Sequence, residues 1–138
     1  MANFFFYGTL REPEIAREIL GRPLSGCSPR PGILSGYKRV YVSGATYPAI
    51  VPDEDHEVDG LLVTRISALE ASRLSRYEGP QYLVQEVEIR LKDGTLDQAS
   101  VFVPKPALKV SSRLWDLETW RRQEKKRFMA GLKRNILI

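Results

Sequence analysis

The sequence predicts an α+β domain whose sheet is largely antiparallel and curls toward a barrel, flanked by short helices. Three observations predict this class. Five or six short runs of apolar or alternating residues are typical of strands. Two segments between them carry the start and stop signals of helices. A hairpin signal at Asp93 and Gly94 joins two of the runs, which makes those two antiparallel neighbours.

Length and composition indicate one globular domain, residues 1–138. Hydrophobic residues make up 43% of the chain and charged residues 28%, as is usual for proteins that fold in water. No apolar run approaches the roughly 18–20 residues of a membrane helix. The first residues lack the pattern of a signal peptide. We therefore expect a soluble protein without membrane insertion and with a cytoplasmic location.

The first elements are expected to be a strand and a helix. Residues 3–7 are aromatic and apolar, which predicts a buried strand that ends in a turn at Gly8. Pro13 suits the first position of a helix, and Gly21 stops it. Pro, Gly and Ser are frequent in residues 22–36, so we expect irregular connections there.

The middle of the chain predicts three more strands, at residues 37–42, 49–51 and 59–65. Between the last two lies an acidic stretch, residues 53–59, that contains His56. Its composition is that of a solvated turn.

The clearest local signal is a helix that begins after Ser67. Ser67 and Glu70 have the spacing of a capping box, in which the serine hydroxyl accepts from the amide three residues on and the glutamate reaches back. The helix is expected to end at Gly79, which is followed by the helix breaker Pro80.

The remaining elements are a hairpin and a terminal helix. Residues 82–91 alternate as a strand does, and residues 99–103 follow the hairpin turn as its partner. Pro104 and Pro106 then lead the chain away from the sheet. A helix is expected at about residues 116–133.

The scarcity of cysteine and histidine restricts the chemistry. One cysteine, Cys27, and one histidine, His56, cannot form an internal disulfide or a zinc site of the usual Cys/His type. A Ser-His-Asp or Cys-His enzyme would need His56 as its base, but its acidic neighbours favour a surface histidine. Cys27 is expected to be a loop thiol or a buried one. We expect neither a metal nor a cofactor.

The first turn has the features of an anion site. Tyr7, Gly8, Thr9 and Leu10, here called the 7–10 turn, connect a strand to a helix. A strand that stops at a glycine and enters a helix leaves successive N–H groups without partners, and such groups bind carboxylates or phosphates. The same pattern also occurs in turns whose role is structural.

Glu78 is the carboxyl best placed to move a proton. It is expected at the C-terminal end of a helix, where the helix dipole opposes negative charge and raises the pKa. A carboxyl whose pKa approaches neutrality can accept a proton from one group and donate it to another. The alternative is a solvated glutamate at a helix end.

Four motifs together resemble a known family. No one of them is specific, but they occur in order and at suitable distances across about residues 3–103. They are similar to the γ-glutamylcyclotransferase-like family, in its branch of γ-glutamylamine cyclotransferases and plant avirulence-induced-gene-2-like proteins. The motifs are Phe6-Tyr7-Gly8-Thr9-Leu10, Tyr47-Pro48-Ala49-Ile50-Val51-Pro52, Val58-Asp59-Gly60 and Tyr77-Glu78-Gly79-Pro80-Gln81-Tyr82.

The resemblance implies a small β-barrel flanked by helices and a reaction that needs no cofactor. Family members convert a γ-glutamyl amine or peptide to 5-oxoproline and a free amine, because the α-amino group attacks the γ-carbonyl of its own glutamyl unit. The resemblance gives Glu78 the role of general acid and base. It also implies that the 7–10 turn holds the α-carboxylate of the substrate, with Tyr82 and Tyr47 as walls of the pocket.

The positive charge of the chain lies in residues 113–138, here called the basic tail, which carry eight Lys or Arg and three acidic residues. One interpretation is an amphipathic helix packed on the barrel through Trp120, Phe128, Met129 and Leu132, with a solvated basic surface. The other is a non-catalytic module of the same fold that binds a small molecule, a nucleic acid, a phosphoinositide or an acidic protein. We expect a small γ-glutamyl substrate rather than nucleic acid.

Overall fold

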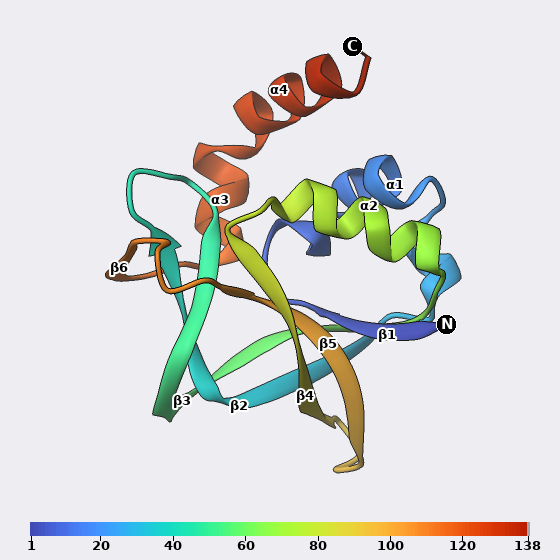
Figure 1. Ribbon diagram of the computed structural model, residues 1–138, viewed down its shortest axis with the longest axis vertical. Helices are drawn as coiled ribbons and strands as arrows, with labels where there is room; N and C mark the ends of the chain where they lie inside the picture. The colour runs from blue at the N-terminus through green and yellow to red at the C-terminus, as the bar shows by residue number, and fades with distance from the viewer. Residues whose placement is uncertain (138) are drawn as a thin grey trace.

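Within residues 1–137, which the computed structural model describes, five strands close into a barrel (Figure 1). Side chains are described through residue 132. Around the barrel the order is β3, β1, β5, β4, β2 and back to β3, and a sixth strand extends the sheet beside β2. The β1–β5 pair is parallel and the other barrel pairs are antiparallel, so the predicted class is confirmed. The strands are β1 (Ala2–Phe6), β2 (Arg30–Val42), β3 (Pro48–Ile66), β4 (Tyr82–Leu91), β5 (Leu96–Pro104) and β6 (Val110–Leu114).

Gly60 allows β1 and β3 to approach closely. A Cβ atom at this position would lie 2.4 Å from the carbonyl oxygen of Phe6 and 2.6 Å from the ring of Phe5. Gly60 pairs with Gly32 of β2, where a Cβ atom would lie 2.5 Å from the side chain of Ile89. Real Cβ atoms essentially never show contacts this short. At Gly60 the contact is with backbone, so this position requires glycine, and at Gly32 a larger residue would displace the side chain of Ile89.

Strand β1 is buried on both faces. Phe5 and Tyr7 belong to the cluster inside the barrel, and Phe4 and Phe6 belong to the cluster between the barrel and the helices. Successive residues of a strand point to opposite faces. A strand covered on both sides is therefore apolar throughout, which explains the continuous aromatic run near the start of the sequence.

Helices α1 (Pro13–Leu20) and α2 (Ala68–Glu78) lie side by side against the outer face of the barrel (Figure 1). The predicted capping box at Ser67 is present, and Gly79, with φ +94°, ends α2 where the sequence placed its end. Two short 3₁₀ helices, η1 (Thr9–Arg11) and η2 (Leu24–Cys27), flank α1 in the sequence.

The prediction for residues 22–66 was partly wrong. β2 begins at Arg30, inside the stretch expected to be irregular, and β3 continues through the acidic residues expected to form a turn. His56 lies in this part of β3 and is exposed, with its Nδ1 3.1 Å from Asp53 Oδ1. The reason for the error is that β3 pairs with β2 on both sides of this stretch, at Pro52 and at Glu57, with a register break between them. These flanking pairs keep the chain extended where its side chains face water.

The C-terminal region differs from the prediction in two respects. Strand β6 was missed, and the expected helix is two helices, α3 (Leu117–Gln123) and α4 (Lys125–Leu137), with a break at Glu124. The apolar side of the tail is packed as expected. Trp120 is buried, and its ring centroid lies 5.5 Å from that of Phe128 in an edge-to-face contact.

The expected solvated basic surface of the tail is only partly present, because two of its basic side chains pair with a buried carboxylate. Glu12, at the start of α1, is 1% exposed. Its carboxylate forms ion pairs with Arg121 of α3 and with Lys125 of α4, the latter at 2.6 Å. Burial alone would raise the pKa of Glu12, but the hydrogen bonds from Lys125 and Arg121 lower it below its ordinary value. Two cations of the tail therefore neutralise a buried charge of the domain.

Removing both partners of Glu12 is expected to destabilise the protein. Arg121→Gln combined with Lys125→Gln leaves a buried carboxylate uncompensated, which costs on the order of 3 kcal/mol. The matched control is Arg122→Gln with Lys126→Gln, which removes the same charge from exposed positions and should change the free energy of unfolding by less than about 0.5 kcal/mol. Urea unfolding of both variants measures the difference. Equal stability of the two variants would contradict the role given to Glu12.

Candidate active site

A cavity of about 200 Å³ opens where β1 leaves the barrel. The four residues of the 7–10 turn form one part of its wall, and Tyr77 and Glu78, at the end of α2, form another. Tyr82, the first residue of β4, and Tyr47, just before β3, complete the set that the sequence proposed. The fold thus brings together all seven predicted site residues: Tyr7, Gly8, Thr9, Leu10, Tyr47, Glu78 and Tyr82.

The 7–10 turn is held in place from several sides. The hydroxyl groups of Thr9 and Tyr77 are hydrogen-bonded at 2.8 Å, which links the turn to the end of α2. A Cβ atom at Gly8 would lie 2.9 Å from the ring of Pro48. No hydrogen bond outside the helices and strands of residues 1–137 uses the N–H of Gly8, Thr9 or Leu10. These donors therefore lack a backbone partner in the described part of the chain, and the three residues line the cavity.

Two tyrosines of the cavity wall donate their hydroxyl protons to backbone carbonyls. The hydroxyl of Tyr7 donates to the carbonyl of Phe102 at 2.7 Å, and that of Tyr82 donates to the carbonyl of Pro48 at 3.1 Å. Burial raises the pKa of both hydroxyls above the ordinary value, with a smaller contribution from Glu78. Both side chains are therefore neutral at physiological pH.

Glu78 has the electrostatic character of a proton carrier. Burial raises the pKa of its carboxyl from 4.5 to about 7. The residue is partly buried, and it lines the cavity. The cause differs from the one inferred from sequence, which was the helix dipole. Desolvation is the effect that the structure adds.

Several cavity residues were not predicted. Phe5, Phe6, Pro48, Tyr77 and Phe102 line the cavity together with Phe128 of α4. Most of these lie within one or two residues of a predicted site residue or in the apolar strands, so proximity in the sequence could have found them. Phe128 could not have been found in that way, since it lies 50 residues after Glu78 and reaches the cavity through the packing of the tail.

The cysteine and the histidine do not contribute to this cavity. Cys27 is buried in η2, and His56 is exposed on β3. In residues 1–137 no group of three or more His, Cys, Asp or Glu side chains is arranged to hold a metal ion. None of the helices described for this chain has the length and apolar character needed to cross a bilayer.

Comparison with known proteins identifies the family. The profile described as "Gamma-glutamyl cyclotransferase, AIG2-like" matches residues 4–122. The chain belongs to this family. The matched region contains the barrel except the first two residues of β1, all seven predicted site residues, and the first helix of the tail except its last residue.

Plant members of the AIG2-like family are similar over nearly the full chain. AIG2-like protein C of Arabidopsis thaliana is 32% identical over 137 residues, which cover 96% of this chain and 76% of the relative. Protein AIG2 C of the same species is 30% identical, with 97% and 81% covered.

Solved structures agree with the fold. The solution structure of an Arabidopsis thaliana protein matches with a TM-score of 0.70 and 27% identity, over 98% of this chain and 81% of that one. A structure titled gamma-glutamyl cyclotransferase matches with a TM-score of 0.61 over 80% of this chain and 68% of that chain. Its identity is 14%, so this second likeness concerns the fold alone.

The raised pKa of Glu78 predicts how its replacement changes stability with pH. The carboxyl of Glu78 binds its proton more tightly in the folded protein than in the unfolded chain. Its ionisation therefore lowers the free energy of unfolding as the pH rises above the unfolded pKa, and this loss is complete above the folded pKa of about 7. Glu78→Gln removes this loss. The variant should gain stability relative to wild type as the pH rises from about 4 to 8, by at most about 3 kcal/mol. Thermal melts across this range measure the difference, and a difference independent of pH would contradict the assigned pKa.

Proposed function

We propose that this protein is a γ-glutamyl cyclotransferase that releases 5-oxoproline and a free amine from a γ-glutamyl amine or peptide, with Glu78 as general acid and base. One observation carries the proposal. A carboxyl with a pKa near neutrality shares a small cavity with the 7–10 turn, whose N–H groups are available to an anion. Membership of the AIG2-like family supports it.

The proposed reaction needs one proton carrier and an ordered substrate. The N–H groups of the 7–10 turn hold the α-carboxylate, and the glutamyl chain folds so that its α-amino nitrogen faces its own γ-carbonyl. Glu78 takes a proton from that nitrogen as the new C–N bond forms. It then gives the proton to the leaving nitrogen as the old C–N bond breaks. Ring closure within one molecule gains much from such positioning, and no oxidant, water or cofactor enters the balance.

The proposal also includes a direction for the leaving amine. A groove among α1, α2 and α4 shares Tyr77 and Phe128 with the cavity wall. The cavity itself accommodates a small glutamyl unit, so a larger leaving group would extend past these two rings into the groove. A cytoplasmic location remains our expectation, in agreement with the free thiol of Cys27.

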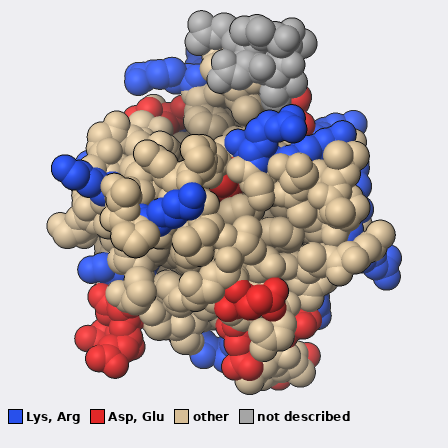
Figure 2. Space-filling model, in the orientation of Figure 1, with Lys and Arg blue, Asp and Glu red and all other residues tan. Residues whose placement is uncertain are grey.

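The alternative is a non-catalytic module of the same fold that binds an anionic partner through the basic tail. Acidic side chains gather at the end of the barrel far from α4, and basic ones are more frequent nearer to it (Figure 2). However, Arg121 and Lys125 neutralise Glu12, and Arg113 lies over the ring of Tyr41 at 4.3 Å. Three of the six basic side chains within residues 113–132 thus contact the domain itself. Fewer of them remain for an anionic partner, so the enzyme is the better supported proposal.

Glu78→Gln should abolish release of 5-oxoproline and leave ligand binding nearly intact. Glutamine has a similar shape but cannot exchange a proton at neutral pH, and loss of a general acid and base costs at least roughly 10²-fold in kcat. The assay follows 5-oxoproline formed from a panel of γ-glutamyl amines. The Arg122→Gln, Lys126→Gln double variant is the control, and it should keep wild-type turnover on the same panel. A Glu78→Gln enzyme as active as wild type would end the proposal.

The pH dependence of catalysis should report the same carboxyl. Glu78 must be ionised to accept the first proton, so kcat/KM should fall as the pH decreases through about 7, with a slope of one proton. Steady-state kinetics between pH 5 and 8 measure this limb. An acidic limb centred near the ordinary glutamate value of 4.5 would show that Glu78 is not the group that controls the rate.

A further inference from the structure

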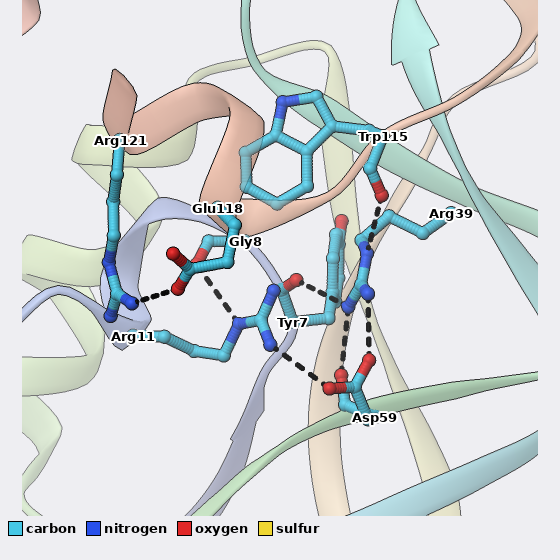
Figure 3. Close-up of polar contacts among 8 residues, drawn as sticks. All are labelled: Tyr7, Gly8, Arg11, Arg39, Asp59, Trp115, Glu118 and Arg121. Carbon is cyan, nitrogen blue, oxygen red and sulfur yellow. Dashed lines mark hydrogen bonds and ion pairs between the residues drawn. The ribbon is translucent and has the colours of Figure 1, made fainter. Parts of the chain in front are cut away.

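Two arginines contact the backbone of the 7–10 turn (Figure 3). Neither Arg11 nor Arg39 lines the cavity. Arg39 Nη1 donates to the carbonyl oxygen of Tyr7 at 3.0 Å, and Arg11 Nε donates to that of Gly8 at 3.4 Å. The backbone N–H of Arg11 donates to the same Gly8 oxygen at 3.1 Å. The carbonyls of the first two turn residues are therefore held toward the arginines.

The direction of these carbonyls determines the direction of the amides. In a planar trans peptide the C=O of one residue and the N–H of the next point in opposite directions, and no peptide bond among the described residues is cis. A carbonyl of Tyr7 held by Arg39 thus turns the N–H of Gly8 away from Arg39. The carbonyl of Gly8 does the same for the N–H of Thr9. Both residues line the cavity.

Arg39 is itself held by several hydrogen bonds from the nitrogens of its planar guanidinium group. Nη2 donates to Asp59 Oδ1 at 2.7 Å, Nη1 also donates to the Asp59 carbonyl at 2.8 Å, and Nε donates to the Trp115 carbonyl at 3.1 Å. The guanidinium lies 5.8 Å from the centre of the Trp115 ring. Its side chain is 13% exposed. Three elements, β2, β3 and the segment after β6, therefore meet at this one side chain.

Asp59 connects the two arginines. Its second oxygen, Oδ2, lies 3.4 Å from Nη1 of Arg11, whose side chain is 10% exposed. Burial would raise the pKa of Asp59, but the hydrogen bond and the charge of Arg39, together with the charge of Arg11, lower it below its ordinary value. The carboxylate is therefore ionised and balances two cations. The Arg11–Arg39–Asp59 cluster is thus one ion-paired network, in which the arginine side chains are covered and that of Asp59 is 64% exposed.

We propose that Arg39, fixed by Asp59, is a positioning residue that orients the N–H groups of Gly8 and Thr9 toward the cavity, so that they hold the α-carboxylate of the substrate. This inference rests on the proposed function for the identity of the ligand. The orientation of the turn does not depend on it. Arg39 acts through the backbone and does not touch the substrate.

The role requires arginine rather than a positive charge alone. A lysine at residue 39 has a single nitrogen and cannot bond to the Tyr7, Asp59 and Trp115 oxygens with fixed geometry. Lys38, the next residue of β2, provides a matched control. Its Nζ forms an ion pair with Asp53 of β3 at 3.5 Å and has no contact with the turn.

The test compares Arg39→Lys, Arg39→Met and Asp59→Asn with Lys38→Met, in the full chain. With a γ-glutamyl amine we expect both Arg39 variants to raise KM at least roughly 10-fold and to leave kcat within about 3-fold, since a carboxylate held equally in the ground and transition states affects KM. Asp59→Asn should change KM in the same direction by less. On a substrate whose α-carboxylate is blocked as an amide, Arg39→Lys and wild type should be equally poor.

A second measurement is independent of turnover. The amide NMR resonances of Gly8 and Thr9 should shift in Arg39→Lys and should stay in place in Lys38→Met, and affinity for 5-oxoproline should fall with the shift. Unchanged amide resonances and unchanged affinity in a folded Arg39→Lys would overturn the positioning role. If wild type neither turns over nor binds 5-oxoproline, the proposed function is wrong, and the two amide resonances still decide whether Arg39 orients the turn. Should Arg39→Met not fold, the lysine and Asp59 variants carry the same test.

Discussion

Burial of β1 on both faces is the constraint on which the site depends. Its aromatic side chains fill the barrel on one side and the layer beneath the helices on the other, so the strand cannot shift without opening two cores. The backbone must also leave the barrel where the next glycine allows it. That point is Gly8, and the turn that follows inherits the rigidity of the strand. A binding turn placed at the end of such a strand is ordered before any ligand arrives.

The same packing explains how one carboxyl suffices for the proposed chemistry. Glu78 ends α2, and α2 lies against the outer face of the barrel beside the exit of β1. Protein atoms replace most of the water around the carboxyl, and the loss of water is what brings its pKa to about 7. A glutamate in water would remain ionised at neutral pH and would be a poor proton donor to a leaving amine. Position in the fold therefore raises the pKa of this glutamate to the neutral range that the proposed role requires.

The basic tail is packed on the rest of the domain through both ion pairs and apolar contacts, although its composition indicates a solvated surface. Glu12 attracts a cation from each of the two tail helices, and Trp120 packs beneath them. This attachment brings Phe128 to the wall of the cavity and of the adjoining groove. Variation in α4 would therefore alter the groove beside the cavity while the barrel and Glu78 stay unchanged.

The sequence by itself determined the features that depend on neighbours along the chain. These are the aromatic strand before Gly8, the capping box at Ser67, the end of α2 at Gly79 and the hairpin at Gly94, because caps, turns and alternation are local properties. Motif order further pointed to the four turn residues and to Glu78.

Only the tertiary structure decided the rest, because the deciding contacts join residues far apart in the sequence. Pairing with β2 before and after a register break keeps β3 extended through exposed acidic residues that have no local strand signal. The cavity beside Glu78 has walls from β1, β5, the start of β4 and α4. The support of the 7–10 turn joins Arg39, Asp59 and Trp115. Arg121 and Lys125, which the sequence predicts to be solvated, form ion pairs with the buried Glu12. Long-range burial and pairing leave no pattern in a short window of sequence, so these features could be known only from the fold.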